Sequence, residues 1–219
     1  MARSATVARG LEGIVSHETR LSEVDGTAGR LTIGGYDIGD LVGRVSFEEA
    51  AHLLWFGRLP NAAELADLHR EMAQARRLPH IIQTALEGSI RRATGMHALR
   101  MSAALLSLDD PGVDDIGAEA SRVHAIRLTA RVPMLVTSHF RQRQGQALAL
   151  PPDHLGFAAA YLYALEGREA DAARIAALDA YLVAVIEHGM NASSFTARVI
   201  ASTNSDMVSA ITGAIGALK

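Results

Sequence analysis

The sequence predicts an all-α fold with one small β-hairpin near the N-terminus. Capping signals stand directly before several apolar stretches, and within those stretches apolar residues recur three and four positions apart, which predicts helices from about residue 46 to 218. Residues 22–38 instead combine glycine-rich turns with two short extended arms, which predicts the hairpin. Strands and helices do not alternate, so no parallel sheet is expected.

Composition favours a soluble protein with a substantial core. Of the 219 residues, 49% are hydrophobic and 21% are charged, which suits one or two globular domains. The net charge of −3 does not favour a nucleic-acid partner, and pairs such as Arg76-Arg77 and Arg91-Arg92 are typical of solvated helix faces. The apolar runs are too short to span a membrane, and residues 1–10 have no signal-peptide pattern. We therefore expect a cytoplasmic protein without a membrane partner.

Two helix starts are marked by capping boxes. Ser46 with Glu49 predicts a helix that begins near residue 47, and Asn61 with Glu64 predicts the next one. The apolar residues of the second helix form one stripe, made of Leu65, Leu68, Met72 and Ala75.

The rest of the chain divides into further helices at proline and glycine signals. The pattern predicts helices over 80–90, 96–108, 114–144, 153–165, 171–188, 194–203 and 205–218. Pro133 lies inside the long helix, where a kink or a break is expected. Gly189 is expected to stop the apolar helix 171–188 directly after His188.

Several kinds of chemistry leave no signature. The chain has no cysteine, which excludes disulfides, thiolate zinc sites and a cysteine nucleophile. None of its nine histidines stands four residues from another, so no helical zinc site is predicted. No glycine-rich phosphate loop is present, and we expect no permanently bound cofactor.

One segment has the character of a binding site. Residues 187–194 read Glu-His-Gly-Met-Asn-Ala-Ser-Ser, and they lie between two predicted helices. His188 and Asn191 can both donate hydrogen bonds to a carboxylate, and the following helix offers unpaired backbone N–H groups to an anion. In the alternative interpretation, His188 is a C-terminal helix residue, while Asn191 and Ser193 are helix caps.

This segment resembles the oxaloacetate-binding segment of bacterial citrate synthases, and the resemblance runs along the whole chain. Around the segment, the similar residues are 187–193, 195–198 and 201–203. Elsewhere they are 10–14, 29–31, 34–38, 47–60 and 141–145. The resemblance implies the helical large domain of a citrate synthase-type enzyme, with residues 1–219 as its N-terminal portion and without the small domain.

The resemblance implies an enzyme that condenses oxaloacetate with acetyl-CoA as co-substrate. It assigns His188 and Asn191 to oxaloacetate binding, and it assigns Ser193 to support of the histidine that stabilises the enol. The family's catalytic histidines and aspartate follow a Gly-Pro-x-His-Gly-Gly segment, which would begin after Lys219. We therefore expect a truncated chain that contains no catalytic residue and is inactive alone.

One residue and one short stretch depart from the family pattern and bear on the substrate. Val185 stands where the family often has another histidine, and residues 94–97 read Thr-Gly-Met-His where many bacterial members have His-Pro-Met-Asp. A 2-methylcitrate synthase that uses propionyl-CoA therefore stays open. So does a non-catalytic helical module for dimerisation or dicarboxylate binding. A homodimer is expected through helices near 121–140 and 172–187.

Overall fold

The computed structural model describes residues 18–218, which fold into ten α-helices, two short 3₁₀ helices and one small sheet. The elements in chain order are β1 Ser22–Asp25, β2 Arg30–Ile33, β3 Tyr36–Asp37, α1 Ile38–Leu41, α2 Phe47–Phe56, α3 Ala62–Ala75, α4 His80–Glu87, η1 Ile90–Arg92, α5 Gly95–Ala104, η2 Leu105–Asp109, α6 Ala118–Arg143, α7 Phe157–Glu166, α8 Ala172–Ala184, α9 Ala192–Ala201 and α10 Met207–Ala217. The predicted segment 10–14 and the N-terminal residues 1–10 lie outside the described residues.

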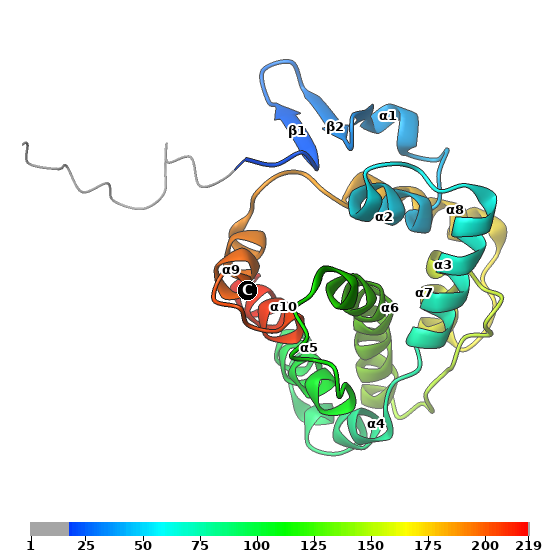
Figure 1. Ribbon diagram of the computed structural model, residues 1–219. Helices are drawn as coiled ribbons and strands as arrows, with labels where there is room; N and C mark the ends of the chain where they lie inside the picture. The colour runs from blue at the N-terminus through cyan, green and yellow to red at the C-terminus, as the bar shows by residue number, and fades with distance from the viewer. Residues whose placement is uncertain (1–17, 219) are drawn as a thin grey trace, which may run out of the picture.

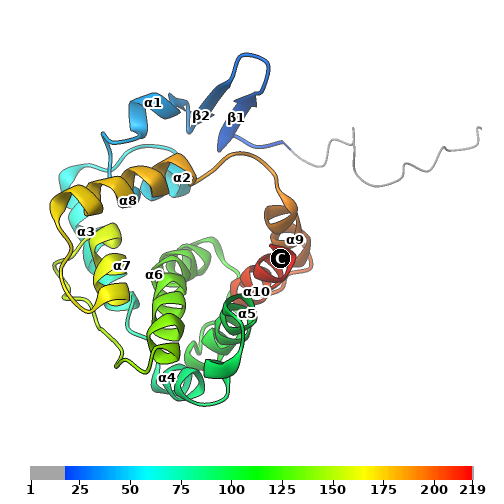
Figure 2. The ribbon, with the colours of Figure 1, turned by 180° about the vertical axis from the view of Figure 1, so that it is seen from behind.

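The helices form two groups on either side of the long helix α6. Figures 1 and 2 show α2, α3, α7 and α8 on one side of α6, with the sheet above them. Helices α5, α9 and α10 stand on the other side, and α4 lies below the end of α6. Beyond α6, the two groups are joined by the connection 185–191, which runs from α8 to α9 past the base of β1 in both views. This connection carries the segment that the sequence singles out.

Three apolar clusters hold these groups together. The first joins α4, α5, α6 and α10, and its members include Leu86, Leu135 and Ile215. The second joins the sheet, α1, α2 and α8 around Ile33, Leu53 and Val183. The third joins α3 to α6 around Leu68, Met72, Ile126 and Ala130. Burial of these side chains supplies the main driving force for the arrangement.

The predicted hairpin is present, and a third strand extends it. Strands β1 and β2 pair antiparallel, with Ser22 opposite Ile33. The two-residue strand β3 pairs with the other edge of β2. Gly34 has a φ of +55°, and a Cβ atom at this position would lie 2.8 Å from the Leu53 side chain. Glycine at this position therefore lets the sheet approach α2 closely.

Both capping boxes form as predicted. The Ser46 hydroxyl accepts the N–H of Glu49, and the Glu49 carboxylate accepts the N–H of Ser46. Asn61 and Glu64 make the same exchange at the start of α3. Of the predicted stripe on α3, Leu68 and Met72 are buried and the other two members are half-buried.

The long helix α6 is not broken at Pro133, although proline removes a backbone donor there. Its neighbours Met134 and Leu135 are buried, and the Thr137 hydroxyl donates to the Pro133 carbonyl at 3.1 Å. Packing on both sides of α6 therefore keeps the helix continuous through the proline.

The predicted end of α8 is wrong. The helix ends at Ala184, with Val185 as its C-cap, so His188 lies in the connection rather than on the helix. Among the residues of α8 only Val183 is buried, whereas Tyr181 is 61% exposed. The sequence pattern could not place this end, because apolar residues continue to Ile186 and that side chain packs against the sheet and α2 instead of continuing the helix.

The expectation for the arginine pairs is wrong at Arg76. Arg91, Arg92 and Arg77 are exposed, but Arg76 is only 5% exposed, and its Nη2 donates to the Leu155 carbonyl at 2.8 Å. The guanidinium holds the loop before α7 against α3, which no local sequence pattern indicates.

Candidate functional site in the connection between α8 and α9

The connection 185–191 presents His188 at the surface of the molecule. The His188 side chain is exposed, and the preceding Ile186 packs against the cluster around Val183. Asp179 of α8 accepts the N–H of Phe47 at 3.0 Å, which fixes α8 to the start of α2. The connection therefore leaves a well-anchored helix and turns outward at the histidine.

Glu187 stabilises the turn on both sides of His188. Its Oε1 atom accepts the hydroxyl of Ser22 at 3.0 Å and the N–H of Gly189 at 2.6 Å. Gly189 has a φ of +93°, which disfavours any residue with a Cβ atom. A glycine therefore follows the histidine because of the backbone conformation, although it does not cap α8 as predicted.

Asn191 begins helix α9. Its side-chain oxygen accepts the N–H of Ser194 at 2.9 Å, as an N-cap does. This leaves the side-chain NH₂ as a donor for a ligand, so the capping role and the binding role are compatible on one residue. Ser193 lies in the first turn of α9 and is half-buried, not the cap.

The arrangement provides three kinds of donor for an anion: an imidazole, a carboxamide and the free N–H groups at the start of a ten-residue helix. No basic side chain follows in the first turn of α9, so a carboxylate would be bound by hydrogen bonds and the helix dipole. Among residues 18–218, no group of three or more side chains has the composition of a metal site.

A large hollow lies elsewhere. A cleft of about 820 Å³ opens between α2 and α3 on one side and α6 on the other, and it contains none of the predicted site residues. Most of its charges are already paired, including Arg58 with Glu64 and Arg127 with Asp110. The lining also carries more carboxylates than arginines, so the cleft does not favour a carboxylate ligand.

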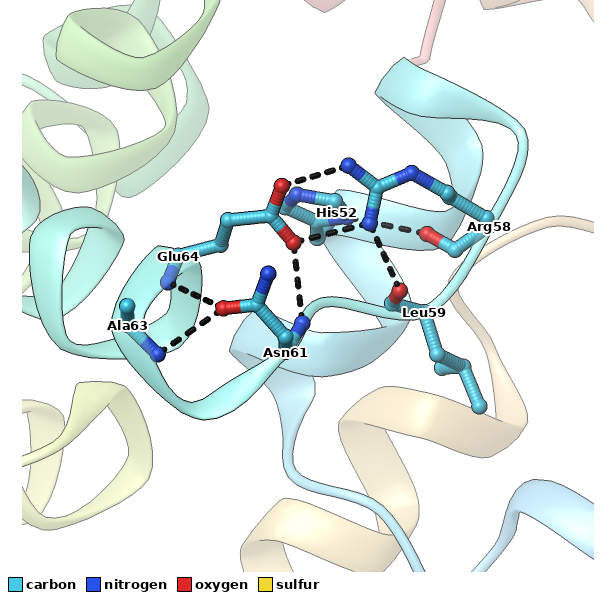
Figure 3. A network of polar contacts seen from close by, with 6 residues as sticks. All are labelled: His52, Arg58, Leu59, Asn61, Ala63 and Glu64. Carbon is cyan, nitrogen blue, oxygen red and sulfur yellow. Dashed lines mark hydrogen bonds and ion pairs between the residues drawn. The ribbon is translucent and has the colours of Figure 1, made fainter.

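Figure 3 shows the paired charges on one wall of this cleft. The Arg58 guanidinium donates to both carboxylate oxygens of Glu64, and the side-chain oxygen of Asn61 accepts the N–H of Glu64 at the start of α3. The hydrogen bond from Arg58, together with that from the Asn61 backbone, lowers the pKa of Glu64 to about 2. His52 contacts the Arg58 carbonyl through Nδ1 at 2.9 Å. These contacts fix the turn between α2 and α3.

A second polar group is buried between α2, α3 and α7. Glu48 is 3% exposed, accepts the N–H of Phe157 at 2.7 Å, and lies 3.1 Å from Nε2 of His69. Burial by itself would raise the pKa of Glu48, but the hydrogen bonds from His69 and Phe157 outweigh it and lower the pKa. Because these contacts join three helices, the group has a structural role.

The helical fold and the donors in the connection define a class: an all-α protein with a candidate carboxylate site at a helix N-terminus. A family model described as citrate synthase, C-terminal domain, matches residues 10–219. The chain therefore belongs to the citrate synthase family. The predicted family and all-α fold are confirmed.

Individual proteins similar to this chain are a citrate synthase and a 2-methylcitrate synthase. The chain is 42% identical over 216 residues to "Citrate synthase 2" of Bacillus subtilis, covering 98% of this chain and 57% of that protein. It is 38% identical over 213 residues to a 2-methylcitrate synthase of Mycobacterium tuberculosis, covering 97% and 54%. The chain thus spans little more than half the length of these relatives.

Solved structures match the fold closely. The citrate synthase of Thermoplasma acidophilum, in a ternary complex with carboxymethyl coenzyme A and oxaloacetate, superimposes with a TM-score of 0.91 at 27% identity, covering 98% of this chain and 56% of that chain. The enzyme from Pyrobaculum aerophilum gives a TM-score of 0.86 at 32% identity, covering 95% and 54%. None of the helices within residues 18–218 has the length and apolar content that crossing a bilayer requires.

Proposed function

We propose that this chain is the oxaloacetate-binding portion of an enzyme that condenses oxaloacetate with acetyl-CoA to give citrate and CoA. The observation that carries the proposal is the exposed His188 directly before a helix that Asn191 caps. Residues 1–219 form the N-terminal portion of the large domain in this proposal, and the small domain lies outside them.

Each site residue has a distinct role. The imidazole of His188 and the free NH₂ of Asn191 donate hydrogen bonds to oxaloacetate, and the start of α9 adds favourable electrostatics. Ser193 supports the enol-stabilising histidine of the complete enzyme. Proton transfer belongs to residues that have no counterpart among these 219, and acetyl-CoA is a co-substrate rather than a bound cofactor.

We expect no turnover by the 219-residue chain alone. Citrate formation is measured with acetyl-CoA and oxaloacetate, using the Bacillus relative as the positive control. Without an acid–base pair the barrier to enolisation stays high, so the chain should match the no-enzyme rate. Steady citrate production would show that the catalytic groups are wrongly assigned.

Oxaloacetate binding tests the site directly. His188→Ala should weaken oxaloacetate binding by about 10- to 100-fold, because a hydrogen bond to a charged group is worth roughly 1.5–3 kcal/mol. His154→Ala, which removes another exposed histidine, is the matched control and should leave the dissociation constant unchanged. Equal affinities for the two variants would contradict the assignment.

A chimera tests whether the site supports catalysis. Residues 1–219 are joined to the remaining C-terminal portion of the Bacillus relative, which is 42% identical over the shared part. The chimera should form citrate, and His188→Ala in the chimera should reduce kcat/KM strongly. A folded, inactive chimera would favour the alternative of a non-catalytic helical module for dimerisation or dicarboxylate binding.

A second candidate function is 2-methylcitrate synthesis from propionyl-CoA. It is favoured by the 38% identity to the Mycobacterium enzyme, a value close to that for the Bacillus relative. The groups that contact the acyl chain belong to the rest of the enzyme. Comparison of kcat/KM for acetyl-CoA and propionyl-CoA on the complete natural protein decides between the two substrates.

We also propose a cytoplasmic homodimer, in line with the cysteine-free sequence and the exposed apolar residues of α6 and α8.

A further inference from the structure

We propose that Ser22 and Glu187 are positioning residues, which together hold His188 in the orientation that binds oxaloacetate. The inference rests on the proposed function, and it assigns part of the site to the N-terminal sheet. Ser22 lies in β1, 165 residues away from Glu187 in the sequence. Figures 1 and 2 both show β1 above the connection from α8 to α9.

One carboxylate oxygen of Glu187 joins the turn to the sheet. Oε1 of Glu187 accepts hydrogen bonds from the Ser22 hydroxyl at 3.0 Å and from the Gly189 N–H at 2.6 Å. The acceptor is the residue before His188, and the second donor is the residue after it. The backbone on both sides of the histidine is therefore tied to the same carboxylate, which is tied in turn to the sheet.

Strand β1 contacts the same turn at a separate point. A Cβ atom built on Gly189 would lie 3.7 Å from Cγ2 of Val24, so the strand lies against the turn at a second point. Below this contact, Ile33 of β2 is fully buried in the cluster that contains Val183 and packs Ile186. The sheet thus has a rigid base beside the connection.

Helix α8 does not hold the backbone of His188. Because the helix ends at Ala184, no intrahelical hydrogen bond fixes the backbone of His188. A free turn would lose conformational entropy when it binds a ligand, and that loss would weaken the affinity. The carboxylate bridge removes part of this freedom before the ligand arrives.

Oxaloacetate affinity is the first measurement. Ser22→Ala should weaken binding roughly three- to tenfold, the range expected for one hydrogen bond. Ser22→Thr keeps the hydroxyl and should restore the affinity to within about twofold. Glu23→Ala, which alters the adjacent exposed residue of the same strand, is the matched control and should bind as the wild type does. An unchanged affinity in Ser22→Ala would overturn the inference.

A double-mutant cycle separates positioning from general support of the fold. If both residues act through one bridge, Ser22→Ala combined with Glu187→Ala should lose no more affinity than Glu187→Ala alone. Glu187→Gln, which keeps an acceptor oxygen, should lie between wild type and Glu187→Ala. Additive losses would mean that the two residues act separately, which contradicts the bridge.

Hydrogen exchange of the Gly189 amide tests the bridge without any ligand. Ser22→Ala should speed this exchange several-fold while the amides of α9 keep their wild-type rates. If the wild-type chain fails to bind oxaloacetate but this acceleration is seen, the positioning role stands and the proposed function fails. Unchanged exchange at Gly189 would reject the positioning role whatever the ligand result.

Discussion

Glu48 illustrates how a single charged side chain contributes to this fold. Its carboxylate is buried and bridges three helices through the Phe157 N–H and the His69 ring. A buried carboxylate without partners would be strongly destabilising, but here the hydrogen bonds compensate for its burial. The residue therefore specifies how α2, α3 and α7 meet, and it contributes to packing rather than to the proposed oxaloacetate site.

Removal of this carboxylate should destabilise the protein. Glu48→Ala leaves the Phe157 N–H without its acceptor and His69 without its partner, so the free energy of unfolding should fall by about 3 kcal/mol. Glu48→Gln keeps an acceptor and should cost less. Urea unfolding measures both, with Glu87→Ala on an exposed helix position as the control. Equal stabilities for Glu48→Ala and Glu87→Ala would contradict the role.

The same pair predicts a pH dependence. The hydrogen bond that the His69 ring donates to Glu48 raises the pKa of His69. The stability from the charged ring is therefore present below its ordinary pKa of about 6.5 and is lost as the pH rises through the raised value. The lowered pKa of Glu48 acts in the other direction, because its contribution is lost as the pH falls below about 4.5.

Urea unfolding at pH 6 and pH 8.5 checks the histidine. The wild-type free energy of unfolding should decrease between these values, and His69→Gln should show a smaller decrease. His154→Gln, at an exposed histidine without this pair, should retain the wild-type decrease. If the free energy of unfolding falls equally in the wild type and in His69→Gln, the pH dependence comes from other groups.

At the scale of elements, the positions of two helix ends determine the structure of the candidate site. Helix α8 ends before the histidine, whereas α9 begins at Ala192, directly after its N-cap Asn191. The candidate site is therefore a connection that is tied to the sheet and followed by a capped helix. Because Asn191 uses its oxygen for the cap, only its NH₂ faces a ligand in the proposed function. The two roles can be separated by substitution.

The Asn191→Asp variant should still cap α9, but it should bind oxaloacetate more weakly. Aspartate caps helices as well as asparagine does, so stability should change by less than about 0.5 kcal/mol. The new negative charge and the lost donor should weaken oxaloacetate binding by roughly tenfold or more. Calorimetry measures the affinity, and thermal unfolding measures the stability.

A matched cap serves as the control. Asp206 caps α10 through the Ser209 N–H at 2.8 Å, so Asp206→Ala removes a similar cap from the neighbouring helix. It should cost about 1 kcal/mol of stability and leave the affinity unchanged. If Asn191→Asp binds oxaloacetate as tightly as wild type, Asn191 is a cap and nothing more.

At the scale of the whole molecule, apolar surface remains uncovered. Val136 and Phe140 lie one helical turn apart on α6 and are 38% and 46% exposed, and Tyr181 on α8 is 61% exposed. Apolar residues one turn apart on the same helix face are typical of subunit interfaces. This surface supports the proposed homodimer.

Sedimentation of the chain tests the homodimer. Wild type should sediment as a dimer at micromolar concentration, and Phe140→Asp should raise the dimer dissociation constant at least about tenfold, because a charge would be buried at the interface. Leu108→Asp changes a more exposed apolar residue outside α6 and α8, and it should leave the dimer intact. A wild-type monomer at high concentration would reject this interface.

Much of the fold could be predicted because its signals are local. The caps at Ser46 and Asn61 depend on residues three positions apart, and the glycines of the hairpin permit turns that other residues resist. The likeness around His188 likewise needs only a short stretch of chain. Hydrogen-bonding options and backbone preferences of this kind depend only on residues that are close together in the sequence.

The sequence by itself thus determined the helical class, the start of most helices, the family and the segment that holds the candidate site. Tertiary structure decided where α8 ends, why α6 continues through Pro133, and that Arg76 and Glu48 are buried. It also brought Ser22 to Glu187 across 165 residues. These features depend on which distant surfaces pack together, and the free energy of that packing outweighs the local preferences that a sequence pattern reports.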